Sequence, residues 1–141
     1  MIPRVVLDTN ILVSALRSRS GASFRLLSLI DSGKYVPCLS VSLILEYEVA
    51  TKKQAKALGL THSDIDNVLD YICLVAEHRK VYYLWRPTLK DPNDDMVLEL
   101  AVSGEVEAIV TYNRGDFKGA EGFGMRIISP GVFLKQIGEL P

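Results

Sequence analysis

The sequence contains few of the residues that build soft-metal or membrane sites. It has only two histidines and two cysteines, and Cys38 and Cys73 form no Cys-x-x-Cys spacing and have no histidine nearby. This excludes a zinc site of the usual ligand type and favours reduced, buried thiols. No apolar run approaches the roughly 18 residues of a membrane span, and the first charged motif comes too early for a signal peptide. We therefore expect a soluble, cytoplasmic protein with no membrane association.

The sequence also lacks a strong excess of charge of either sign. Its net charge is −1, so no global basic field indicates a nucleic-acid partner. The distribution is uneven, because residues 1–60 carry eight Lys/Arg against four Asp/Glu and residues 61–141 carry eight against thirteen. Any electrostatic steering must therefore be local. No repeat, low-complexity segment or linker divides the 141 residues, which predicts one domain spanning 1–141.

A short motif at residues 4–14, RVVLDTNILVS, organises the rest of the chain. The apolar run that precedes Asp8 is typical of a strand buried on both faces, and Thr9 and Asn10 are suitable N-cap residues for a following helix. Asp8 then lies at the carboxyl end of a strand, where open parallel sheets bind ligands. The alternative is that Asp8 merely caps the helix, and this motif alone does not decide between the two.

Strands and helices alternate along the whole chain. The pattern predicts strands at 35–39, 80–85, 108–111 and 126–129 besides the first, and helices that include 42–50, 61–75, 94–102 and 132–140. Such alternation favours a single-domain α/β/α sandwich around a five-stranded parallel sheet.

Two glutamates of the predicted helix after residue 40 point in different directions. Glu46 shares a face with apolar residues, so an acid there is costly unless something compensates it. Glu48 has Lys52 four residues later, which is the spacing of an exposed ion pair. Glu46 is therefore a candidate site residue, whereas we expect Glu48 at the surface. The basic cluster at 52–56 is most simply a solvated helix face, although it could contact a phosphate backbone.

Further acids lie near the later strands. A helical wheel places Asp94 among Val97, Leu98 and Ala101, facing inward, and directs Asp95 a quarter turn away, where we expect it at the surface. Either acid alone would also suit the positive end of a helix. The strand at 108–111 opens into a polar loop that carries Asn113 and Asp116.

Four acids thus fall where they can meet: Asp8, Glu46, Asp94 and Asp116. Two unit charges 4 Å apart repel by about 4 kcal/mol at an effective dielectric of 20, so such a group requires a cation. Oxygen ligands without His or Cys select Mg²⁺ or Mn²⁺, and such a site suits phosphodiester hydrolysis. Thr111 and Asn113 are neutral neighbours that could orient water or a phosphate oxygen.

At this point the sequence resembles the PIN-domain ribonucleases, in particular the prokaryotic toxin branch of toxin–antitoxin pairs (VapC-like). The resemblance covers nearly the whole chain through four motifs: VVLDTNILVSAL (5–16), SLILEYEVA (42–50), DPNDDMVLELAVSGEVEAIVTYNRGDF (91–117) and IISPGVFL (127–134). It implies a five-stranded parallel sheet, three or four carboxylates that bind Mg²⁺ or Mn²⁺, and endonucleolytic cleavage of single-stranded or loop RNA.

The resemblance also assigns roles to individual residues. The first three acids of the family correspond to Asp8, Glu46 and Asp94, and its polar position after the fourth strand corresponds to Thr111. This chain has Asn113 where many members have a fourth aspartate, but TYNRGDF fits the variant Thr-x-Asn-x-x-Asp-Phe, which places the fourth acid at Asp116. Asp91 and Asp95 are spare acids nearby.

The expected mechanism is in-line attack of water on an RNA phosphodiester. Asp8, Asp94 and Asp116 would hold the metal, and Glu46 would orient or deprotonate the water. Arg17, Arg19, Arg114 and the lysines at 52–56 are hypothetical backbone contacts. In the toxin branch a small antitoxin protein would occupy the cleft, and the protein would be a homodimer.

Two other functions fit parts of the sequence. One is a catalytically silent PIN-fold module that binds RNA or protein, which only Asn113 supports. The other is a phosphoacceptor receiver domain, which expects a Lys before the proline of the last strand, where this chain has Ser129 and Pro130.

Overall fold

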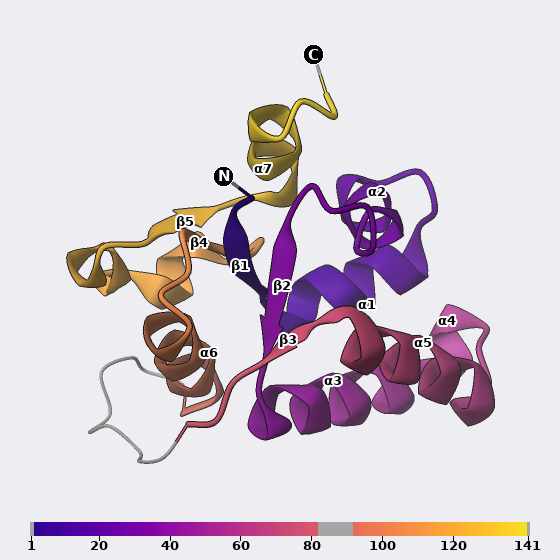
Figure 1. The fold of residues 1–141 in the computed structure, drawn as a ribbon. Helices are drawn as coiled ribbons and strands as arrows, with labels where there is room; N and C mark the ends of the chain where they lie inside the picture. The colour runs from indigo at the N-terminus through magenta and orange to yellow at the C-terminus, as the bar shows by residue number, and fades with distance from the viewer. Residues whose placement is uncertain (1, 82–91, 141) are drawn as a thin grey trace.

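The computed structural model describes residues 2–81 and 92–140 of the chain. Strands and α-helices alternate along these residues, as the sequence predicts (Figure 1). The elements are β1 (Arg4–Leu7), α1 (Thr9–Arg17), α2 (Ala22–Ser28), β2 (Val36–Leu39), α3 (Val41–Lys53), α4 (Ala55–Leu58), α5 (His62–Val75), β3 (Glu77–His78), α6 (Pro92–Ser103), β4 (Ala108–Val110), the 3₁₀ turns η1 (Arg114–Phe117) and η2 (Ala120–Phe123), β5 (Arg126–Ile128) and α7 (Pro130–Gln136).

The five strands form one parallel sheet in the order β3-β2-β1-β4-β5. The first strand is therefore central, with β2 on one side and β4 on the other. In the β1–β4 pair, Val6 lies opposite Ile109 and Leu7 opposite Val110, so the two strands end side by side. The predicted α/β fold with a five-stranded parallel sheet is confirmed.

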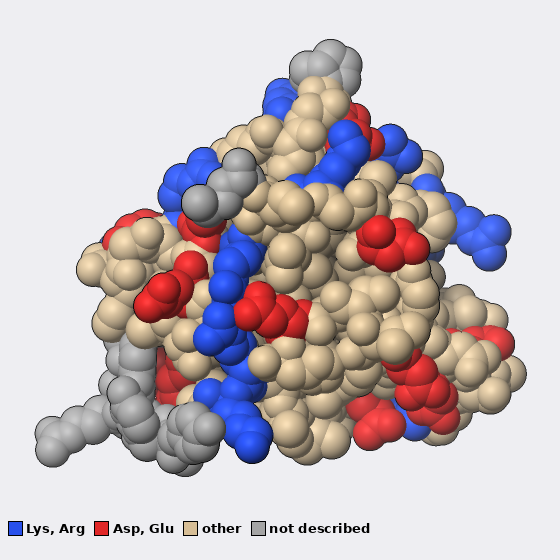
Figure 2. All heavy atoms as spheres, in the orientation of Figure 1, with Lys and Arg blue, Asp and Glu red and all other residues tan. Residues whose placement is uncertain are grey.

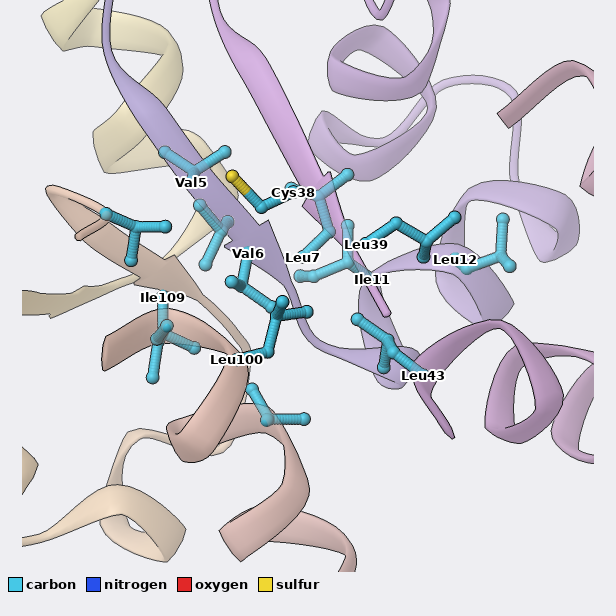
Figure 3. Close-up of a cluster of buried hydrophobic side chains, with 14 of the residues drawn as sticks. Val5, Val6, Leu7, Ile11, Leu12, Cys38, Leu39, Leu43, Leu100 and Ile109 are labelled. Carbon is cyan, nitrogen blue, oxygen red and sulfur yellow. The ribbon is translucent and has the colours of Figure 1, made fainter. Parts of the chain in front are cut away.

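The hydrophobic core surrounds β1. Val5 and Val6 are fully buried and Leu7 is 7% exposed. Because successive residues of a strand point to opposite faces, both faces of the sheet must be covered. Figure 3 shows side chains of α1, β2, α3, α6 and β4 gathered around this strand, including Ile11, Leu12, Cys38, Leu39, Leu43, Leu100 and Ile109. The core thus holds the end of β1, and with it Asp8, in a fixed position.

The third strand lies earlier in the chain than the sequence predicts. Strand β3 comprises Glu77 and His78, which pair with Cys38 and Leu39 of β2, and the backbone N–H of Arg79 donates to the carbonyl of Leu39. The prediction of a strand at 80–85 is wrong for residues 80 and 81, and residues 82–85 lie outside the described residues. The aromatic and β-branched composition of 80–85 misled the prediction, because pairing with β2 decides where this edge strand forms.

Two helices begin earlier than predicted. Helix α6 begins at Pro92, two residues before Asp94, and α7 begins at Pro130, with the Ser129 hydroxyl accepting from the N–H of Val132. Proline suits the first turn of a helix because the N–H that it lacks would have no helical partner there.

The surface offers no extended field of one charge on the side drawn in Figure 2. Basic residues form a band near the middle of this face, and acidic residues lie on both sides of it. Ion pairs offset part of the positive charge at the surface, since Arg4 and Arg79 both contact Glu77. Among the described residues, no helix is long and apolar enough to span a membrane.

Candidate functional site

A cleft of about 730 Å³ opens where β1 and β4 end. This is the point at which the chain connections diverge to the two sides of β1, the usual position of ligand sites in open parallel sheets. The cleft is lined by residues of α1, α3, the start of α6 and the segment after β4, namely Asp8, Thr9, Asn10, Val13, Ser14, Arg17, Glu46, Ala50, Gln54, Asp94, Tyr112, Asn113 and Asp116. All four acids singled out from the sequence are in this set.

Asp8 both caps a helix and lines the cleft. Its Oδ1 accepts a hydrogen bond of 2.9 Å from the N–H of Thr9, which makes Asp8, and not Thr9 or Asn10, the N-cap of α1. Its Oδ2 accepts a hydrogen bond of 2.8 Å from the hydroxyl of Thr111. The two interpretations left open by the sequence are therefore compatible, because the two oxygens of one carboxylate serve different partners.

Thr111 lies beneath the cleft and forms hydrogen bonds with three of its neighbours. The residue is fully buried, and its Oγ1 donates to Asp8 while it accepts from Asn10 Nδ2 at 3.2 Å and from the Asn113 N–H at 3.0 Å. One hydroxyl thus makes a donor bond and two acceptor bonds, which is its full capacity. Thr111 is a positioning residue for Asp8 and for the polar loop after β4.

Helix α3 presents Glu46 to the cleft and Glu48 to solvent. Tyr47, which lies between them, is buried, and its hydroxyl donates to the carbonyl of Leu7 at the end of β1. Burial and the nearby Asp8 charge raise the pKa of Tyr47 well above its usual value. Glu48 pairs with Lys52 at 2.9 Å, as its spacing predicts. The tyrosine therefore anchors to the end of β1 the helix that brings Glu46 to the cleft that Asp8 also lines.

The acids of α6 differ from the prediction in one respect. Asp94 lies in the first turn of α6 and lines the cleft, as expected. Asp95, expected at the surface, is only 9% exposed, and Glu99, one turn later on the same face, is 6% exposed. The expectation for Asp95 is wrong because a helical wheel gives relative directions and does not show which of them the rest of the fold covers. Asp91 lies outside the described residues.

The segment after β4 brings both Asn113 and Asp116 to the cleft. The turn η1 is closed by a hydrogen bond of 3.0 Å from the Asp116 N–H to the Asn113 carbonyl, and the fully buried Phe117 anchors it to the core. Both polar side chains are exposed. The carboxylate of Asp116 and the amide of Asn113 can therefore both reach a ligand in the cleft.

Sequence reasoning did not identify Tyr112, Ser14 or Gln54 as cleft residues. Gln54 continues the stripe of Glu46 and Ala50 at intervals of four residues, and Ser14 lies one turn after Asn10, so helical periodicity could have found both. Tyr112 gave no such signal. Among the predicted basic contacts, Arg17 lines the cleft, whereas Lys52 is held by two carboxylates, those of Glu48 and Asp66.

The ligands that the cleft offers are hard oxygen donors. Four carboxylates converge from four segments of the chain, together with the amides of Asn10, Gln54 and Asn113, and this set suits Mg²⁺ or Mn²⁺ rather than zinc. Within residues 2–81 and 92–140, no three His, Cys, Asp or Glu side chains are already arranged to hold a metal ion. The fit to a divalent cation therefore rests on the chemistry of the donors.

Comparison with known proteins agrees with this fold. A family model described as PIN domain matches residues 4–115, a range that includes Asp8, Glu46, Asp94, Thr111 and Asn113 and ends one residue before Asp116. The chain belongs to the PIN-domain family. No curated protein sequence matches the chain.

One similar solved structure is that of VapBC2 from Rickettsia felis bound to a DNA fragment from their promoter. A chain of that structure matches with 16% sequence identity and a TM-score of 0.60, over 88% of this chain and 96% of the other. At this level of identity the match confirms the fold. The two chains have nearly the same extent, so the shared fold accounts for almost all of each.

Proposed function

We propose that this protein is a metal-dependent endoribonuclease that hydrolyses RNA phosphodiester bonds. The observation that carries the proposal is the convergence of Asp8, Glu46, Asp94 and Asp116, from four separate segments, on one cleft at the ends of β1 and β4. Helix capping accounts for Asp8, but no shared structural role accounts for all four acids lying in one polar cleft. Membership of the PIN-domain family supports the same activity.

The carboxylates of Asp8, Asp94, Asp116 and Glu46 would hold Mg²⁺ or Mn²⁺. Such a cation, when bound, polarises the phosphoryl oxygens and lowers the pKa of water. The residues of the chain would then orient the metal ligands, the water and the phosphate. Thr111 keeps Asp8 oriented toward the cleft through its hydrogen bond. Glu46, which lines the same cleft, would orient the attacking water and accept its proton, and the Asn113 amide would orient the water or a phosphate oxygen.

We further propose that the protein is the toxin of a cytoplasmic toxin–antitoxin pair. The similarity in fold to a chain of VapBC2 supports this assignment, as does the family resemblance of its motifs. A small antitoxin protein would occupy the cleft, where a basic side chain could neutralise the carboxylates, and the protein would form a homodimer. Purification of the tagged chain from its native cell, followed by mass spectrometry of any small protein that copurifies and by size measurement of the complex, tests both partners.

Cleavage of a labelled RNA pool tests the activity. The purified protein, free of any co-purified inhibitor, is incubated with Mg²⁺, Mn²⁺ or EDTA, and the ends of the products are mapped. We expect cutting in single-stranded or loop segments with either metal and none with EDTA. Absence of cutting in both metals by a folded protein would overturn the proposal and favour a silent module that binds RNA or protein.

A further inference from the structure

The cleft extends well beyond its acids along one helix. Asn10, Ser14 and Arg17 of α1 line it at intervals of four and three residues. At 1.5 Å per residue, the nine residues from Asp8 to Arg17 span about 13 Å. The side chain of Arg17 donates to Oε1 of Gln54 at 2.9 Å, so the far end of α1 faces the far end of α3. We call this part of the cleft, formed by Ser14, Arg17, Ala50, Gln54 and Tyr112, the distal arm.

The distal arm differs in charge from the acid end. None of its lining residues is acidic, and Arg17 forms no salt bridge within the described part of the chain. Its hydrogen-bond partner Gln54 is neutral, and a guanidinium has five N–H donors. Arg17 therefore keeps its positive charge and most of its donors available at the cleft.

Tyr112 forms a fixed aromatic wall of this arm. Its hydroxyl is hydrogen-bonded to the buried hydroxyl of Ser23 at 2.7 Å, and its backbone N–H donates to Asn10 Oδ1 at 3.3 Å. The side chain is nevertheless 47% exposed. Since the hydroxyl is already occupied, the residue offers the cleft the surface of its ring. A tethered, half-exposed ring in a polar cleft is the arrangement on which a nucleobase can stack with little loss of side-chain freedom.

We propose that the distal arm binds one nucleotide of a single RNA strand next to the acids, with the base stacked on Tyr112 and a phosphate bound by Arg17. This inference deepens the proposed function, on which its choice of ligand rests. Bases in a duplex are stacked on each other and cannot pack on a side chain, whereas bases in single strands and loops can. The arm would therefore select unpaired RNA.

Matched controls lie elsewhere on the surface. Tyr71 of α5 is 42% exposed and its hydroxyl is bonded to Asp31, which reproduces the tethering of Tyr112 away from the cleft. Arg126 of β5 is exposed, carries the same charge as Arg17 and donates to Oε1 of Gln136 as Arg17 does to Gln54, but it lies outside the cleft. Tyr71→Leu and Arg126→Gln thus control for changes in the surface alone.

The test measures binding and cleavage separately. Binding of a fluorescent single-stranded 12-mer RNA and of a fully paired hairpin is followed by anisotropy in Mg²⁺, with all variants made in an Asp8→Asn background to prevent cutting. We expect Tyr112→Leu to weaken single-strand binding at least about fivefold and Tyr112→Phe, which keeps the ring, to bind within about twofold of the parent. Arg17→Gln should weaken binding and reduce the slope of log K against log salt by about 0.7. The controls should match the parent, and hairpin binding should not change.

Each outcome decides one of the two proposals. If the wild-type protein cuts RNA but Tyr112→Leu and Arg17→Gln bind like the control variants, the nucleotide subsite is overturned and the nuclease stands. If the wild type does not cut but these two variants lose binding, the subsite stands and the nuclease is overturned. Absence of both binding and cutting overturns both. Arg17→Gln and Tyr112→Phe keep the test valid if Tyr112→Leu fails to fold.

Discussion

The hydroxyl of Thr111 donates a 2.8 Å hydrogen bond to Oδ2 of Asp8, although 103 residues separate the two in sequence. Asp8 follows β1 and Thr111 follows β4, and the two strands are neighbours in the sheet. The same hydroxyl accepts from Asn10 and from the N–H of Asn113. This buried hydroxyl therefore couples the first acid of the cleft to the loop that carries Asn113 and Asp116.

Removing this hydroxyl should damage both stability and activity. Thr111→Val keeps the shape of the side chain but leaves two donors and one carboxylate oxygen without their partner. We expect a loss of about 1.5–3 kcal/mol in the free energy of unfolding, because one of the bonds is to a charged group. Metal-dependent RNA cleavage should fall roughly 10- to 100-fold, as for other groups that orient ligands. Thr111→Ser should restore most of both, and a Thr111→Val protein with wild-type activity would contradict the positioning role.

Helix α3 supplies a matched pair of glutamates for testing the orientation of the site. Glu46→Gln keeps the shape and removes the charge that lines the cleft, so RNA cleavage should fall roughly 100-fold or more. Glu48→Gln breaks only a half-exposed surface pair with Lys52, which keeps its contact with Asp66. That variant should cut at the wild-type rate and lose less than about 1 kcal/mol of stability. Equal rates for the two variants would show that Glu46 plays no part in the reaction.

Tyr47, the buried neighbour of Glu46 on α3, predicts that the free energy of unfolding decreases at alkaline pH. Burial raises the pKa of Tyr47 above the ordinary value of about 10, and the Asp8 charge adds to the effect. Above pH 10 the unfolded chain releases this proton and the folded chain keeps it, so stability is fully present below pH 10 and falls as the pH rises further. Burial raises the pKa of Tyr35 in the same way.

Urea unfolding at pH 8, 10 and 11 measures this dependence. Each such tyrosine should contribute a loss of about 1.4 kcal/mol per pH unit above pH 10. Tyr47→Phe should therefore show a slope smaller by about that amount, together with a loss of about 1 kcal/mol at pH 8 because the Leu7 carbonyl loses its donor. If the mutant and the wild type decline equally between pH 10 and pH 11, Tyr47 is not the group responsible.

Local patterns in the sequence were sufficient to predict most of the carboxylate cleft. The apolar run before Asp8 and the one before Thr111 each indicate a buried strand, and parallel strands end on the same side of a sheet. Helical spacing separated Glu46 from Glu48 in the same way, because the direction of a side chain on a helix repeats every 3.6 residues. These predictions succeed because strand direction and helix face are local properties.

The relationships that the sequence could not predict are all tertiary. The hydrogen bond of Tyr112 to Ser23 joins residues 89 positions apart, and nothing in the local pattern selects that partner. The turn after α6 is a second case. It places Glu105, and not the neighbouring Gly104, at a positive φ of +50°. A Cβ on Gly104 would lie 3.2 Å from the Leu100 carbonyl oxygen and 3.3 Å from Cγ1 of Val106, so close contacts at this turn favour the glycine.

The most direct test of the central claim is the rate of metal-dependent RNA cleavage by Asp8→Asn. Asparagine is as good an N-cap as aspartate, so α1 should keep its cap. Its amide nitrogen cannot accept from Thr111, and the loss of this bond opposes the gain from removing one like charge, so the protein should remain folded. Asp70→Asn, an exposed change on α5, is the control. We predict that Asp8→Asn remains folded and loses RNA cleavage, while Asp70→Asn cuts like the wild type. Cleavage by Asp8→Asn at the wild-type rate would contradict the assignment of the carboxylate cleft as the active site.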